Sequence, residues 1–177
     1  TAFSRYAARV WGMEGGSFAS ALMVAAAAAF LSYIPVGFIS GMIGRKKTII
    51  IGVITMTVSY FFIHLFLKPS PMINVVFALT GFGWAAINVN SYPMVVEMSK
   101  SGDIGKYTGL YYTSSMAAQI FTPIFSGFLL ENVSYRTLFP YAVLFSTLSL
   151  FTMLFVKHGD IKPSKKKSAI ENFNIEY

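Results

Sequence analysis

The sequence predicts an all-α, polytopic membrane protein, and three observations support this prediction. The 177 residues are 55% hydrophobic and only 12% charged, whereas soluble domains carry about a quarter charged residues. The charged residues gather between long apolar stretches, and about 20 apolar residues in a helix span the hydrocarbon of a bilayer. These stretches are continuous, whereas the strands of a membrane barrel would show alternating segments of about ten residues. We therefore predict five transmembrane helices, at about residues 17–41, 48–67, 72–96, 107–130 and 137–156.

The first two predicted helices are bounded by charges and prolines. No charged side chain lies between Glu14 and Arg45. The alanines at 25–29 predict a helix-contact face, because small residues let membrane helices approach closely; the alternative is a helix-favouring filler. The second helix ends before Pro69 and Pro71, which cannot continue it. Because this turn is short, the second and third helices should form an antiparallel hairpin.

The third predicted helix combines a Gly-x-Gly pattern at 81–83 with polar residues and a proline. Polar side chains are costly in hydrocarbon unless they face protein or a water-filled cavity. Asn88 and Tyr92 stand four residues apart and share a face, whereas Asn90 points about 200° away. All three could contact one ligand only if the helix unwound near Pro93. The pattern predicts a cavity-lining, substrate-binding helix; the alternative is hydrogen bonding that only holds helices together.

The fourth predicted helix has a polar stripe of Tyr112, Ser115 and Gln119, spaced three and four residues apart. Tyrosine, serine and glutamine offer donors, acceptors and an apolar ring, which suits an uncharged polyhydroxylated ligand. A purely structural role for each of these residues remains the alternative.

The sequence shows no sign of an enzyme. It contains no cysteine, and we find no metal-binding cluster, phosphate-cradling loop or Gly-x-Ser-x-Gly motif, so no metal or cofactor is expected. No acidic residue lies inside a predicted helix, and Glu97, at the end of the third, is the candidate for coupling to a cation. The lysine run at 165–167 is expected to face lipid headgroups and not nucleic acid.

The distribution of positive charge predicts the orientation in the membrane. Ten of the 14 lysines and arginines fall on one side of the predicted helices, and such an excess marks the cytoplasmic side. Residues 157–177 should therefore form a basic cytoplasmic tail, and residues 1–16 an extracytoplasmic segment. The protein is expected in the plasma, or inner, membrane.

The stretch GFISGMIGRKK at 37–47 resembles the loop motif of the major facilitator superfamily of secondary transporters. The motif is Gly-x-(Leu or Ile)-(Ala or Ser)-Asp-x-x-Gly-Arg-(Lys or Arg), and this chain matches it at Gly37, Ile39, Ser40, Gly44, Arg45 and Lys46. Gly41 stands where the family has aspartate, as in the looser second copy of the motif. The resemblance implies that the five helices correspond to helices 8–12 of a twelve-helix fold. Residues 1–16 would then be the end of helix seven and its loop, and an amino-terminal half should precede them.

A finer resemblance covers residues 81–131, which look like sugar and cation symporters of the sucrose-type and glycoside-pentoside-hexuronide groups. The match rests on Asn-x-x-x-Tyr-Pro at 88–93 and on Gly105, Tyr107, Gly109, Gln119 and Pro123. It implies alternating access, in which two halves of the protein rock about a central site, with a sugar as the solute. Transport of a drug, organic cation or peptide, and a non-transporting membrane module, are the alternatives.

Overall fold

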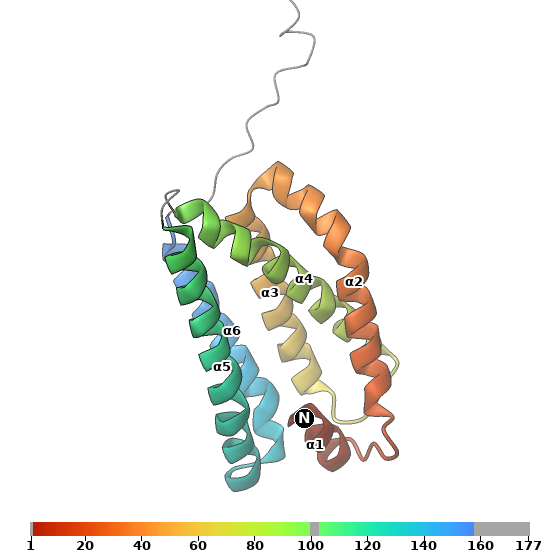
Figure 1. The fold of residues 1–177 in the computed structure, drawn as a ribbon. Coiled ribbons are helices and arrows are strands. Elements are labelled where there is room, and N and C mark those ends of the chain that lie inside the picture. The colour runs from red at the N-terminus through yellow and green to blue at the C-terminus, as the bar shows by residue number, and fades with distance from the viewer. Residues whose placement is uncertain (1, 100–102, 158–177) are drawn as a thin grey trace, which may run out of the picture.

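The computed structural model describes residues 2–99 and 103–157, and within these ranges all regular structure is helical (Figure 1). The predicted tail therefore lies outside the described residues, apart from Lys157 at its start. The elements are α1 (Ala2–Val10), α2 (Phe18–Ile43), α3 (Arg45–Leu65), α4 (Met72–Met98), α5 (Ile104–Asn132), η1 (Tyr135–Thr137) and α6 (Leu138–Phe155).

The five predicted helices are present as α2 to α6, but they differ in apolarity. Among the described residues, four segments are long and apolar enough to cross a membrane: α2, α3, α4 and the stretch Tyr135–Phe155. Helix α5 is long enough, at 29 residues, but is not one of these four, because serine, threonine, tyrosine and glutamine lie along it. A helix of this composition is best accommodated where one face meets protein or water.

Helix α4 is the centre of the packing, with α2 on one side and α3 on the other. Glycines make both crossings close. A Cβ atom built at Gly81 would overlap the Ala25 carbonyl oxygen of α2, and one at Gly83 would lie 2.7 Å from the Gly52 carbonyl oxygen of α3. The predicted alanine contact face of the first helix and the predicted hairpin of α3 and α4 are thus confirmed.

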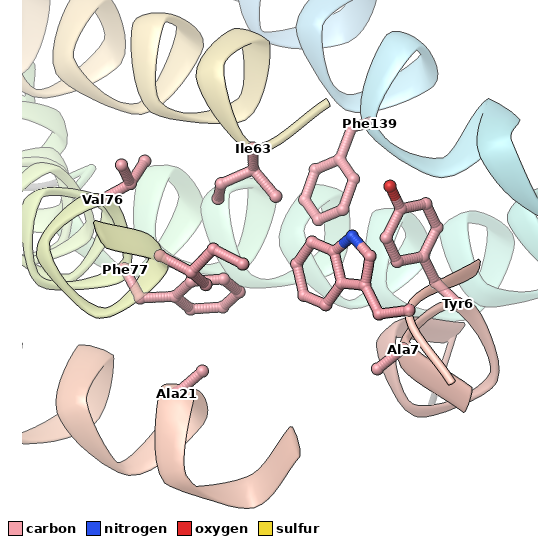
Figure 2. Close-up of a cluster of buried hydrophobic side chains, with 9 residues drawn as sticks. Tyr6, Ala7, Ala21, Ile63, Val76, Phe77 and Phe139 are labelled. Carbon is pink, nitrogen blue, oxygen red and sulfur yellow. The ribbon is translucent and has the colours of Figure 1, made fainter. Parts of the chain in front are cut away.

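The two ends of the bundle differ in character. One end, here called the basic end, holds the described cations Arg45, Lys46, Lys47, Lys106 and Lys157. The opposite end, here called the aromatic end, is closed by α1 and a buried cluster that includes Tyr6, Trp11, Ile63, Phe77 and Phe139. Figure 2 shows side chains from several helices converging there, and the Tyr6 and Phe139 rings meet edge to face with centroids 4.8 Å apart.

The aromatic end also contains a polar contact that fixes α1 to α3. The Trp11 indole nitrogen donates a 2.9 Å hydrogen bond to the carbonyl oxygen of Phe66, the capping residue that follows α3. We expect Trp11→Phe to lower the free energy of unfolding by about 1 kcal/mol, because it retains a buried ring and removes the donor. Thermal unfolding in detergent would measure this loss. Since Trp84 is half exposed, Trp84→Phe is the matched control and should unfold close to the wild-type temperature.

Candidate functional site

The predicted polar residues of α4 lie on two opposite faces of a continuous helix. The backbone is helical from Met72 to Met98, so α4 is not unwound near Pro93. Asn90 is fully buried, and its amide nitrogen donates to the Ala86 carbonyl oxygen at 2.8 Å. Asn88 is exposed, and its amide donates to the Trp84 carbonyl oxygen at 2.9 Å. The three residues therefore do not meet at one ligand: Asn88 and Tyr92 share the open face, and Asn90 packs inside.

A cluster of three tyrosines joins α4 to α5. The Tyr92 ring centroid lies 5.8 Å from that of Tyr111 and 5.7 Å from that of Tyr112. Tyr111 and Tyr112 are themselves 5.3 Å apart, with their rings nearly perpendicular. The Tyr92 hydroxyl lies 3.4 Å from that of Thr108, at the long end of the hydrogen-bond range. Tyr112 keeps 47% of its surface exposed, so a ring face is available beside the junction.

From this tyrosine cluster two polar stripes run toward the aromatic end. On α5 the stripe continues through Ser115 to Gln119, whose amide donates to the Ser115 hydroxyl at 3.3 Å. On α4 the stripe passes from Tyr92 to Asn88, one helical turn away. Figure 1 shows α4 leaning toward α2 and α5 running beside α6, so the stripes diverge. The five predicted residues thus form two arms that meet at Tyr92 and Tyr112, and within the described ranges no hydrogen bond joins Asn88 to α5.

Two cavities beside α4 were not predicted. One, of about 440 Å³, lies between α2, α3 and α4 and has the aromatic walls Phe30, Tyr33, Tyr60 and Trp84. Another, of about 290 Å³, lies between α3, α4, α5 and α6 near the basic end. None of the five predicted residues lines either cavity. The helical spacing of Trp84 and Asn88, four residues apart, is the signal that could have added Trp84 to the stripe.

The GFISGMIGRKK stretch forms the link between α2 and α3, and it is tighter than predicted. Only Gly44 separates the two helices, with φ of 95°, a conformation that favours glycine. Its amide donates to the Ser40 carbonyl oxygen at 3.0 Å, and its own carbonyl accepts from the Thr48 amide at 3.2 Å. The predicted helices left residues 42–47 as a loop, and this was wrong, because α2 continues to Ile43 and α3 begins at Arg45. A Cβ built at Gly37 would meet no atom within 4 Å beyond its own helix backbone, so no neighbouring helix packs closely against this glycine.

The two cations that follow Gly44 contact two different helices. Arg45 Nε donates to Glu97 Oε1 at the end of α4, at 2.7 Å, with side chains that are 31% and 21% exposed. The Lys46 ammonium donates to the backbone oxygens of Leu154 at 3.1 Å and Val156 at 2.6 Å. A cation at a helix carboxyl end is favourable because it meets unpaired carbonyl groups and the negative end of the dipole. The basic end of α3 is thereby fixed to both α4 and α6.

Glu97 has a second oxygen that is not used in this contact. Its Oε2 atom is buried and has no hydrogen-bond partner among the described residues, and the same is true of Asn90 Oδ1. Most buried polar atoms are hydrogen-bonded, so each exception needs an explanation. One carboxylate oxygen of Glu97 therefore accepts from Arg45, and the other has no hydrogen-bond partner among the described residues.

Long apolar helices, a polar face on two of them and charged contacts at one end define a polytopic α-helical membrane protein. The chain belongs to the Major Facilitator Superfamily, whose family model matches residues 1–174. It is thus an integral membrane protein of a secondary transporter family. No curated protein and no solved structure matches the chain.

Proposed function

We propose that this chain forms most of the carboxyl-terminal half of a twelve-helix transporter that moves a sugar or glycoside together with a cation. The observation that supports the solute class is the pair of polar stripes that meet at Tyr92 and Tyr112. They offer amide and hydroxyl groups beside an exposed aromatic ring and contain no formal charge, which suits a polyhydroxylated, uncharged solute. The amino-terminal half of such a transporter would face these stripes and close the site during alternating access.

Glu97 is the proposed coupling residue. Its unpartnered Oε2 is an acceptor that a proton or a metal cation could use, while Arg45 holds Oε1. The basic end, where this pair lies, is proposed to face the cytoplasm, because lysine and arginine are enriched on that side of membrane proteins. In this proposal, the contact between Arg45 and Glu97 changes when the cation binds to Glu97 and again when it leaves.

A second solute class is favoured by the 440 Å³ cavity. Its walls are aromatic, with Tyr33 and Trp84 ring centroids 6.3 Å apart, and its floor is made of Ala25, Ala29 and Gly81. Aromatic faces attract organic cations and flat apolar rings. A hydrophobic organic cation is therefore the competing solute, with Trp84 in place of Gln119 as the main contact.

A paired substitution experiment separates the two solutes. In the full-length transporter we expect Gln119→Ala to weaken sugar binding roughly tenfold, because a hydrogen bond of about 1.4 kcal/mol is lost. Ser114→Ala, on an exposed part of α5 outside the stripe, is the control and should leave affinity unchanged. The measurement is the ligand-dependent rise in melting temperature across sugars and hydrophobic cations. Stabilisation by cations alone, reduced by Trp84→Ala and not by Gln119→Ala, would replace the sugar proposal with the second one.

A further inference from the structure

The 290 Å³ cavity near the basic end, here called the slot, is lined by residues of α3, α4, α5 and α6. On α4 its lining runs from Ile87 to Met98, and on α6 it includes the last two turns up to Val156. At 1.5 Å per residue, the α4 segment is about 16 Å long. This length matches half of a hydrocarbon core of about 30 Å, which is one leaflet.

The inner wall of the slot is apolar. Ile49, Val53 and Met94 form a buried cluster, with Met153 and Val156 packed against it, and all five line the cavity. Water would find few hydrogen-bond partners on this wall. A hydrocarbon chain would instead gain dispersion contacts that an empty cavity lacks. The wall therefore suits a flexible apolar chain of one-leaflet length.

Hydroxyl groups line part of the slot, and two cations lie at its edge. The lining also contains the hydroxyl-bearing residues Ser91, Tyr111, Ser149 and Thr152. The Lys46 ammonium lies 2.6 Å from the Val156 carbonyl oxygen at the slot's edge, and Lys157 is the next residue and is exposed. Each such cation near the membrane surface attracts an anionic headgroup by about 1 kcal/mol.

We propose that this slot binds one acyl chain of an anionic phospholipid, whose phosphate lies beside Lys46 and Lys157. None of the five stripe residues lines the slot, which meets the proposed solute site only at Tyr111, whose ring contacts Tyr92 and Tyr112. The chain fills the space between α4 and α6, the two helices that the cations of α3 connect at this end.

The test uses the full-length protein in nanodiscs with equal amounts of phosphatidylglycerol and phosphatidylcholine. Native mass spectrometry after release into detergent counts the retained lipids. We expect wild type to retain one phosphatidylglycerol. Ser149→Trp, which places a ring in the slot, should lower this occupancy at least about fivefold. Leu148→Trp, at the neighbouring half-exposed position of α6, should retain the lipid as wild type does.

A second pair of variants tests the headgroup without changing the slot. Lys157→Gln should lower the preference for phosphatidylglycerol over phosphatidylcholine by about fivefold, since one cation is lost. Lys68→Gln, an exposed lysine at the opposite end, should not change it. Equal retention by Ser149→Trp and Leu148→Trp would overturn the proposed slot. Equal retention of the two lipids by wild type would overturn the anionic headgroup.

Discussion

Gly81→Ala should destabilise the protein more than any other single-methyl change in the described helices. The added Cβ would overlap the Ala25 carbonyl oxygen and lie 3.0 Å from the Ala29 amide nitrogen. Both atoms belong to the backbone of α2, so no side chain can rotate away and the whole helix must shift. Overpacking of this kind costs about 1–3 kcal/mol and sometimes more. We expect a lower melting temperature and a smaller fraction of monodisperse protein in detergent.

Alanine substitutions at two other glycines are the controls, because the added Cβ would meet a smaller obstruction at one and none at the other. A Cβ at Gly83 would meet Gly52 O and Met56 Cγ, both at 2.7 Å. Because the overlap with backbone is smaller than at Gly81 and the methionine side chain can move, Gly83→Ala should lose less stability. At Gly127 nothing lies within 4 Å. Gly127→Ala should therefore stabilise α5 slightly, because alanine favours helix by up to about 1 kcal/mol over glycine. Equal melting temperatures for Gly81→Ala and Gly127→Ala would contradict the close crossing of α2 and α4.

The sequence was sufficient to predict features that depend on one helix at a time. Apolar length predicted α2 to α6, and residue spacing placed Asn88 and Asn90 on opposite faces, as their exposure and burial confirm. The start of α3 at Arg45 was missed, because the charged triplet was treated as loop. A single glycine with positive φ is enough to separate two helices, and the charges then find partners on other helices.

Features that depend on two distant helices could not be predicted. Nothing near Lys46 in the chain indicates that its ammonium meets the Val156 carbonyl, 110 residues away. The cavities likewise arise from how α4 lies against three other helices, so their lining combines residues from several segments. Residue spacing shows which side chains share a face of one helix. It does not show the directions in which α4 and α5 diverge, because packing between helices sets them.

Replacement of Glu97 by glutamine should abolish the dependence of transport on a cation gradient. Glutamine keeps the length of the side chain and an oxygen that can accept from Arg45 Nε, but it cannot bind or release a proton and has no charge for a metal cation. We expect gradient-driven uptake in vesicles to fall more than about tenfold, while solute exchange at equal concentrations on both sides continues. Exchange needs binding and alternating access but no net cation movement.

A charge reversal separates this coupling role from a structural one. Arg45→Glu alone places two carboxylates side by side and should destabilise the basic end. Combining it with Glu97→Arg restores an ion pair between α3 and α4, so the melting temperature should recover because the two substitutions are coupled. The carboxylate then lies on α3, away from its place on α4, and gradient-driven uptake should stay low. If the double variant recovered both stability and gradient-driven uptake, the pair would be only a structural contact, and the coupling site would lie elsewhere in the protein.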